Sequence, residues 1–287
     1  NDGSGLFTTI NRAFYEESFF TDSKYIYDMQ FGRVRSTTTR QDLSICRNHQ
    51  TEIFWNDGSG LPFPPNSTLP GKAITASWGS FNTNGTLNDL AVSDGTQLRI
   101  YFNNGGNGTV GIYSGIGNQY NPNLTFTNIS TSSIQLAQMD PLASLSPNKD
   151  DLVGIVNNGF TICKNNGNNG FQTPVNTPVS GIQSLAVGDI NNDSFIDVAV
   201  TVNGAAFVYL NNGYGAMTLA WATQLSSTST TTLIAIGDVA TIGDAGRLDG
   251  WGDLVIAQHN AGMKVFVNYR YTTGSLFLSS AQQTVNF

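Results

Sequence analysis

Charged residues, cysteine, histidine and long apolar runs are all scarce in this sequence. Charged side chains make up 11% of the 287 residues and only 13 of them are Lys or Arg, so the net charge is −7. A protein that binds nucleic acid needs a basic surface to contact phosphates, and these 13 residues are spread thinly. The composition therefore argues against a nucleic-acid partner, whereas the acidity is compatible with a bound cation.

No stretch approaches the roughly 18 consecutive apolar residues of a membrane-spanning helix. No charged and then apolar leader precedes Asn1. We therefore expect neither a membrane span nor a retained signal peptide. Helical periodicity persists for no more than a turn or two, whereas Gly and Asn are abundant, as the turns between many short strands require.

Only two cysteines occur, Cys46 and Cys163. Two are too few for a disulfide framework or a zinc site. Because they fall in different repeats of the pattern described below, we expect two buried free thiols, with a single disulfide bridge as the alternative.

An acidic loop lies between two runs of alternating apolar residues within residues 185–215. Side-chain oxygens stand at relative positions 1, 3, 5 and 9 of the loop, and the residue at position 7 offers a carbonyl; these residues are Asp189, Asn191, Asp193, Asp197 and Phe195. Calcium takes about six to eight oxygen ligands, which alternate residues of a short loop can supply. The pattern predicts a calcium loop between two strands, and the alternative is an Asx-rich turn that holds only its own backbone.

An EF-hand begins in the same way but has helices on both sides. It also needs Gly at position 6 and Glu at position 12, where this chain has Ser194 and Val200. The flanking segments are short and β-branched, which favours strands. The EF-hand is therefore excluded.

A pattern of about fifty residues recurs five times along the chain. It consists of a strand, a loop, an Asp-Leu or Asp-Val strand, a short turn and an aromatic strand that ends in Asn. The Asp residues that open the second strand are Asp42, Asp89, Asp151, Asp197 and Asp253. Four antiparallel strands in each repeat are what a propeller blade requires, whereas a sandwich does not explain a loop at a fixed place in every unit.

We therefore predict an all-β fold, a β-propeller of four-stranded antiparallel blades that forms a single domain over residues 1–287. The expected blades span approximately residues 31–76, 77–132, 133–182, 183–232 and 233–287, after a lead-in of residues 1–30. Residues 1–5 (NDGSG) repeat the turn of residues 56–60, so residues 6–16 are expected to form an orphan outer strand. Either the five repeats belong to a larger ring of six or seven blades, or this strand pairs with another copy of the chain and links copies head to tail.

The Asp-x-Asn-x-Asp-x-x-x-Asp loop, the Asp-Val-Ala-Val strand after it and the Asn-Asn-Gly-x-Gly turn at 211–215 resemble the FG-GAP/VCBS repeats of integrin-α-like β-propellers. The resemblance covers nearly the whole chain, although only residues 189–197 match the loop motif closely. It implies calcium on one rim of the ring, held by Asp189, Asn191, Asp193, Phe195 and Asp197. It also implies an extracellular protein, secreted or on the cell surface.

The other copies of the loop match less well. The fifth carries an insertion and offers a second calcium loop with the candidate ligands Asp238, Asp244, Asp249 and Asp253. The second copy keeps the oxygens of Ser80, Asn82, Asn84 and Asp89 but loses most of the charge, so we expect a weak or empty site. The first and third copies lack the acidic spacing and are expected to hold no metal.

Six Asn-x-Ser/Thr sequons occur, about the number expected by chance. Asn66, Asn107, Asn123 and Asn128 fall in predicted turns or outer strands and are the glycosylation candidates, whereas Asn192 lies inside the acidic loop and should stay bare. Among the tryptophans, Trp251 lies in the inserted loop and is the candidate for a ligand rim; Trp55 and Trp78 are expected in the core between blades.

Catalytic motifs are missing. His49 and His259 lie in different repeats and neither is paired with a nucleophile, and no nucleophile elbow or phosphate-binding loop is present. Carboxylate pairs such as Asp150 and Asp151 could do acid–base work on glycosides, but their repeat positions suit a structural role. The sequence favours a non-enzymatic module for adhesion, recognition or assembly that binds a protein or glycan. A lectin is the main alternative, and an enzyme that acts on glycans or phosphoesters is the lesser one.

Overall fold

The computed structural model of the chain describes residues 26–34, 40–56, 67–82, 88–103, 124–127, 133–142, 149–225, 232–239, 250–259, 261–268 and 283–285. Within these ranges the chain forms twenty β-strands and no helix, so none of the described residues belongs to a helix that could cross a membrane. The predicted outer strand at residues 6–16 lies outside the described ranges.

The strands form five four-stranded antiparallel sheets, each made of four strands that are consecutive in the chain. The first two sheets contain β1 (Asp28–Gly32), β2 (Asp42–Cys46), β3 (Gln50–Phe54) and β4 (Ser67–Pro70), then β5 (Thr75–Gly79), β6 (Asp89–Ser93), β7 (Gln97–Tyr101) and β8 (Leu124–Thr127). The third contains β9 (Ile134–Ala137), β10 (Asp151–Val156), β11 (Gly159–Cys163) and β12 (Val175–Pro178). The last two contain β13 (Ile182–Gly188), β14 (Asp197–Val202), β15 (Ala205–Asn211) and β16 (Met217–Gln224), then β17 (Thr232–Gly237), β18 (Asp253–Gln258), β19 (Gly262–Phe266) and β20 (Gln283–Val285).

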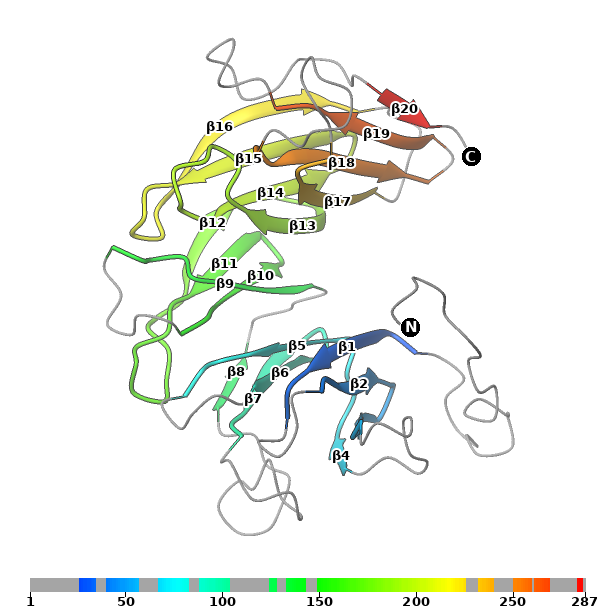
Figure 1. The fold of residues 1–287 in the computed structure, drawn as a ribbon, viewed down its shortest axis with the longest axis vertical. Helices are drawn as coiled ribbons and strands as arrows, with labels where there is room; N and C mark the ends of the chain where they lie inside the picture. Colours follow the sequence, from blue (N-terminus) through cyan, green and yellow to red (C-terminus); the bar gives the residue numbers. More distant parts are fainter. Residues whose placement is uncertain are drawn as a thin grey trace.

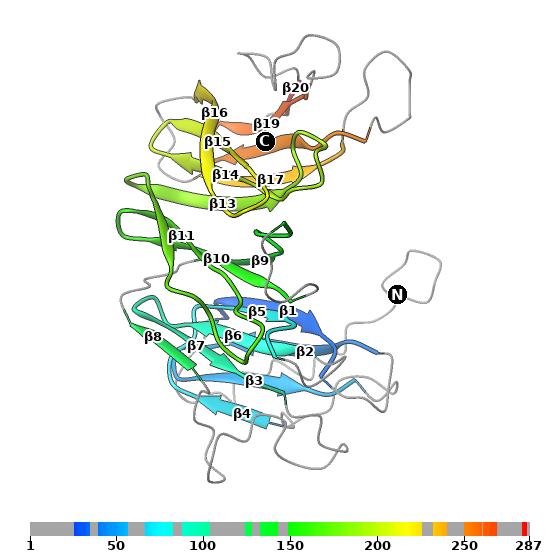
Figure 2. The ribbon, with the colours of Figure 1, turned by 90° about the vertical axis from the view of Figure 1, so that its left-hand side faces the viewer.

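Successive sheets stack through their first strands. β1 packs against β5, β5 against β9, β9 against β13, and β13 against β17. The sheets follow one another along an arc, and the first and fifth sheets lie toward opposite ends of the molecule in both views (Figures 1 and 2). The prediction of an all-β chain built from four-stranded antiparallel units is therefore confirmed.

Apolar side chains fill each space between neighbouring sheets. Four clusters occupy the four spaces; between the fourth and fifth sheets, for example, Ala199 and Val208 pack with Leu254 and Ile256. Because an inner sheet is covered on both faces, its second strand is buried on both sides, and residues 197–201 of β14 are buried without a break. This explains the continuous apolar runs of the second strands in the sequence.

An aspartate opens the second strand of every sheet and ties three segments together. These residues are Asp42, Asp89, Asp151, Asp197 and Asp253, each at most 1% exposed. Each carboxylate accepts a backbone N–H from the residue two places after the first strand and another from the asparagine at the end of the third strand, at 2.7–3.2 Å. The aspartate of the repeat is therefore structural in all five sheets.

The asparagine at the end of the third strand also reaches the preceding sheet, and we call this contact the clamp. Its carboxamide Nδ2 donates to a backbone carbonyl of that sheet at 2.6–2.8 Å. The four pairs are Asn103 to Val34, Asn165 to Phe81, Asn211 to Met139 and Asn268 to Ile190. The clamp therefore links every pair of neighbouring sheets.

A glycine at the end of the first strand receives a side chain of the next sheet. A Cβ atom placed on Gly32 would lie 2.3 Å from Cγ of Trp78, and one on Gly188 would lie 2.8 Å from Cγ2 of Ile236. Leu136 covers Gly79 in the same way, at 2.5 Å. We call the glycine the hole and the covering side chain the knob; at the third sheet, Ala137 takes the place of the glycine.

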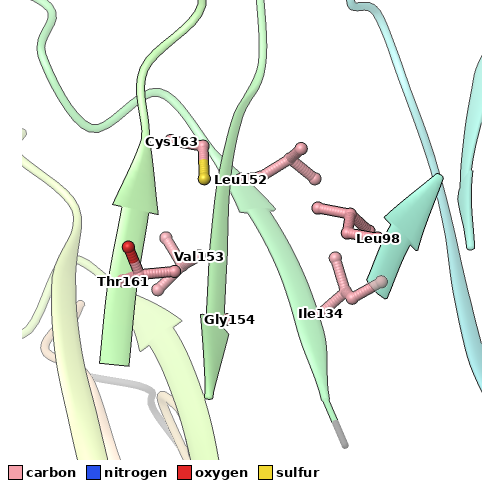
Figure 3. A pocket seen from close by; sticks show the side chains of 7 residues that line it. All are labelled: Leu98, Ile134, Leu152, Val153, Gly154, Thr161 and Cys163. Carbon is pink, nitrogen blue, oxygen red and sulfur yellow. The ribbon is translucent and has the colours of Figure 1, made fainter. Parts of the chain in front are cut away.

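The space between the second and third sheets leaves little room for a ligand. The cavity between the second and third sheets, shown in Figure 3, has a volume of only about 10 Å³. Its lining is almost entirely apolar and consists of Leu98, Ile134, Leu152, Val153, Gly154, Thr161 and Cys163. A cavity needs roughly 10–15 Å³ and polar partners to hold even one water molecule, so this one is a packing defect and no binding site.

Cys46 and Cys163 are both free and buried, on β2 and β11. Burial raises the pKa of each thiol to about 12, so neither is a ready nucleophile. Trp55 and Trp78 pack against the cluster between the first two sheets. These expectations from the sequence are confirmed.

Candidate functional site

The acidic loop connects β13 to β14 and is held by its own side chains. The Asp189 carboxylate accepts the backbone N–H groups of Asp193 at 3.2 Å and Ser194 at 2.8 Å. The Asp193 carboxylate accepts the backbone N–H of Phe195 at 2.9 Å and the Asn191 carboxamide at 2.7 Å. The bond between Asp193 and Phe195 is an Asx turn, and the other bonds also lie within the loop, so the loop has the geometry of the alternative that needs no ion.

Two residues of this loop have left-handed backbones. The φ angles of Asn192 and Ser194 are 54° and 69°, in a region that costs most side chains energy. In this conformation the half-buried Asp189 carboxylate accepts the N–H groups of Asp193 and Ser194, and the exposed Asp193 carboxylate accepts that of Phe195. The loop is therefore compact without help from distant segments.

Asp197 lies below this loop and is fully buried. It accepts the N–H groups of Ile190 and Asn211, both at 2.9 Å, as its counterparts do in the other sheets. Burial raises its pKa to about 6, and the nearby negative charges of Asp193 and Asp189 act in the same direction. The sequence pattern placed Asp197 among the calcium ligands. It did not predict that the aspartate at this position accepts the same two backbone hydrogen bonds in sheets without an acidic loop.

No group of three His, Cys, Asp or Glu side chains in the described part of the chain is arranged to hold a metal. The donor chemistry still suits calcium, because Asp189, Asn191 and Asp193 present carboxylate and amide oxygens within one loop and each carboxylate oxygen has more than one acceptor site. Binding would require the Asn191 amide group to turn away from Asp193, so that its oxygen faces the cation.

The candidate second calcium loop is described only in part. Asp253 is fully buried and accepts the N–H groups of Val239 at 3.0 Å and Asn268 at 2.9 Å, which is the structural role of the repeat. The half-buried Asp238 accepts the N–H of Gly250 at 2.8 Å. Asp244 and Asp249 lie outside the described residues, and Trp251 is half-buried.

Apolar side chains gather beside the acidic loop, at the end where the third and fourth sheets meet. Leu142 and Tyr214 are 55% and 52% exposed. A Cβ atom on Gly213 would lie 2.7 Å from Leu142 and 2.9 Å from the ring of Phe195, so these two side chains cross over a glycine whose φ is 80°. The sequence did not single out Leu142 or Tyr214, because neither belongs to a motif.

Hydrogen bonds hold this surface in place. The Leu142 N–H donates to the carbonyl of Gly213 at 3.1 Å, and the Lys164 ammonium donates to the carbonyl of Tyr214. We call the surface formed by residues 140–142, 189–196 and 212–216 the loop edge. The glycosylation candidates Asn66, Asn107, Asn123 and Asn128 lie outside the described residues.

Solved structures share the fold of this chain. A lectin from Agrocybe aegerita, described for specific recognition of non-reducing terminal N-acetylglucosamine, matches with a TM-score of 0.57 and 16% identity over 92% of this chain and 68% of the lectin chain. BBS1N, in complex with ARL6DN, matches with a TM-score of 0.50 and 12% identity over 91% of this chain and 68% of that chain. A chain of the S. cerevisiae core factor matches with a TM-score of 0.51 and 13% identity over 91% of this chain and 41% of that chain.

Neither a protein-family model nor a curated protein matches this sequence. At identities of 12–16% the likeness to solved structures concerns the fold alone. In its described residues the chain is therefore all-β, with five blade-like sheets, and it is similar in fold to a lectin and to BBS1N.

Proposed function

We propose that the chain is a non-enzymatic binding module of the β-propeller type that recognises a protein or a glycan at the loop edge. The observation that carries the proposal is the exposed pair Leu142 and Tyr214, fixed around Gly213 beside two carboxylates. Exposed aromatic and aliphatic side chains on a rigid scaffold are typical of recognition surfaces. The carboxylates of Asp189 and Asp193 can accept hydrogen bonds from hydroxyl or amide groups of a ligand.

A glycan ligand is the narrower alternative, favoured by the fold shared with the N-acetylglucosamine-specific lectin. A glycan array that includes glycans ending in N-acetylglucosamine tests it. Tyr214→Ala should abolish binding, whereas Leu219→Ala, which removes a side chain that is 51% exposed on β16, should leave it unchanged. An array without any bound glycan, or binding that survives Tyr214→Ala, contradicts a lectin site at the loop edge.

We propose further that the acidic loop binds calcium, with Asp189, Asn191, Asp193 and the carbonyl of Phe195 as ligands and Asp197 beneath them. Ligand at a hundred times its Kd stabilises a folded protein by about 2.7 kcal/mol. Calcium should therefore raise the Tm, and Asp193→Asn should remove this rise. A Tm that does not respond to calcium or to a chelator contradicts the site.

The variant Asp238→Asn tests whether the second candidate loop binds calcium independently of the first. If the second loop contributes, this variant lowers the number of ions bound in calorimetric titration by one and leaves binding at the first loop intact. From the resemblance to FG-GAP/VCBS repeats, we also propose that this chain acts outside the cell, in adhesion or in extracellular assembly.

A further inference from the structure

A pocket of about 410 Å³ opens between the third and fourth sheets, next to the acidic loop. Its apolar lining comes from Leu136, Ala137 and Pro141 on the side of the third sheet and from Val187 and Ile196 on the side of the fourth. The exposed Ser194 of the acidic loop also lines it, so the pocket is open to solvent there. Sites for small ligands have volumes of about 300–1,000 Å³ and mostly apolar walls with a few polar groups. Unlike the cavity in Figure 3, this pocket is therefore large enough for a ligand.

Between the first two pairs of sheets, two hydrogen bonds bridge the equivalent space. They join the residue after the hole to the residue before the buried aspartate of the next sheet. The Arg33 N–H donates to the Asn88 carboxamide oxygen at 2.6 Å, and the Asn88 N–H donates back to the Arg33 carbonyl at 2.8 Å. Ser80 and Asp150 form the same two bonds, at 2.7 and 3.0 Å. We call this pair of bonds the bridge.

Neither bond of the bridge forms between the third and fourth sheets, within the residues that the structure describes. The equivalent residues are Gln138, after Ala137, and Ile196, before Asp197. An isoleucine side chain has no acceptor for the Gln138 N–H. Gln138 and Ile196 line the pocket instead. The wall of the pocket therefore includes a main-chain donor and acceptor whose counterparts in two other sheets are both paired, and main-chain polar groups away from bulk water favour a partner.

Between the fourth and fifth sheets, close packing replaces the bridge. The residue before the buried Asp253 is Gly252, and a Cβ atom on it would lie 3.0 Å from the Asp189 carbonyl oxygen and 3.0 Å from Cγ2 of Ile236. The backbone and the knob therefore fill the space there. In the described part of the chain, neither a bridge nor such close packing fills it between the third and fourth sheets.

We propose that the pocket binds an asparagine of a protein segment, which completes the missing bridge. The asparagine side-chain oxygen accepts the Gln138 N–H, and its main-chain N–H donates to the Gln138 carbonyl, as Asn88 does with Arg33. The inference rests on the proposed recognition of a protein at the loop edge, because Pro141 and Ser194 belong to both the loop edge and the pocket.

The chemistry of the lining favours asparagine over two similar groups. The carboxylates of Asp189 and Asp193 lie in the same loop as Ser194 and would repel a ligand aspartate. The acetamido group of a sugar also carries an oxygen and an N–H, but in a trans amide these point in opposite directions. One acetamido group therefore cannot bond both main-chain groups of Gln138. Apolar side chains next to the asparagine can pack against Val187 and Leu136.

Hydrogen exchange of single main-chain amides, followed by NMR, tests whether the bridge is missing. The amides of Arg33 and Ser80 are hydrogen-bonded. In the free protein the Gln138 amide should exchange at least about a hundredfold faster than either of them. Equal protection of the three amides would mean that the Gln138 N–H already has a partner, and would overturn the proposal.

The substitution Ile196→Asn supplies the missing residue from the chain itself. It should protect the Gln138 amide by at least about tenfold and close the pocket to ligands. The matched variant Ile196→Val keeps an apolar side chain without an acceptor and should do neither. Because Ile196 packs against a core cluster, a cooperative thermal transition must first show that each variant is folded. A folded Ile196→Asn protein whose Gln138 amide stays unprotected would overturn the proposal.

Two peptides probe the pocket in the unsubstituted protein, which keeps the proposal falsifiable if Ile196→Asn does not fold. N-acetyl-Leu-Asn-Val-amide should slow exchange of the Gln138 amide and bind at least about tenfold more tightly than N-acetyl-Leu-Ala-Val-amide, because only the former has a side-chain acceptor. Equal binding of the two peptides, or no response of the Gln138 amide to either, would overturn the proposal. Protection of this amide by N-acetylglucosamine in place of the asparagine peptide would overturn it in favour of a glycan.

Tyr214→Ala separates the failure of this inference from the failure of the proposed function. A ligand that is lost in Tyr214→Ala but binds Ile196→Asn unchanged would leave recognition at the loop edge standing and overturn the role of the pocket. An asparagine peptide that protects the Gln138 amide would support the pocket even if no ligand responds to Tyr214→Ala, which would contradict the loop edge alone.

Discussion

The substitution Asn211→Asp, which replaces the donor group of one clamp by an oxygen, should weaken the contact between the third and fourth sheets. The Asn211 carboxamide donates to the carbonyls of Met139 at 2.8 Å and Ile196 at 3.0 Å, and its oxygen accepts the N–H groups of Gly213 and Gly215. Asn211→Asp keeps the shape and both accepted bonds but removes both donated ones. It also turns a negative oxygen toward two carbonyl oxygens in a buried site.

The magnitude follows from the two carbonyls left without this donor. A buried polar group that loses its partner costs about 1–3 kcal/mol, so we expect the two carbonyls together to lower the free energy of unfolding by roughly 2–6 kcal/mol. For a domain of this size, each kcal/mol shifts the Tm by about 2–4 °C. The Tm at pH 7 should therefore fall by roughly 4–24 °C.

The adjacent residue provides the control. The Asn212 carboxamide oxygen accepts the N–H groups of Tyr214 at 2.9 Å and Ala216 at 3.2 Å, and the carboxylate of Asn212→Asp accepts them equally well. Thermal unfolding, followed by circular dichroism at fixed calcium concentration, compares the two variants. Acid should rescue Asn211→Asp in part, because a protonated carboxyl can donate one bond. If both variants melt within about 1 °C of each other, the clamp does not hold the sheets together.

Three other outcomes follow from buried groups. Burial raises the pKa of Asp89 to about 6, above its unfolded value near 4. The contribution of Asp89 to stability is therefore largest below pH 4 and is lost as the pH rises through 6, on the order of 3 kcal/mol. In urea unfolding, the free energy of unfolding of Asp89→Asn should lack this dependence on pH. Cys46 and Cys163 should stay unmodified by iodoacetamide in the native protein at pH 8 and react after unfolding, and a peptide pair linked by a disulfide would contradict their burial as free thiols. Gly32→Ala should lower the free energy of unfolding by about 1–3 kcal/mol, because its Cβ atom would overpack against Trp78. Gly237→Ala should lower it by less than half as much, because in the described part of the chain nothing lies close to that Cβ atom except Val239. Equal losses of Tm in the two variants would contradict this difference in contacts.

The strands and their grouping could be predicted because both are local. Alternating apolar residues and the Asn-Gly turns mark each strand, and a repeat of five copies fixes which strands belong together. Reading one loop alone grouped Asp197 and Asp253 with the calcium ligands and did not predict their structural hydrogen bonds. Their counterparts Asp42 and Asp151 open the same strand in copies without acidic spacing, and that recurrence was the available signal for a structural role.

The loop edge could not be predicted in this way. Leu142 lies over Gly213, next to Tyr214, only because two sheets stack, and no spacing in the sequence encodes the distance between them. Phe31 occupies a knob position like that of Trp78, yet one is exposed and the other is partly buried in the core. The difference depends on which neighbour is present, and that is a property of the assembled sheets.

The clamps also bear on how the chain folds during synthesis. Each clamp joins residues only 69 to 84 positions apart, and the donor always lies in the later sheet. A completed sheet therefore presents its carbonyl to the next one as it leaves the ribosome, and domains are made from the N-terminus at about 5–20 residues per second. The chain can grow by docking each new sheet on a finished template, so a fault in one clamp should slow the docking of the sheet that carries it.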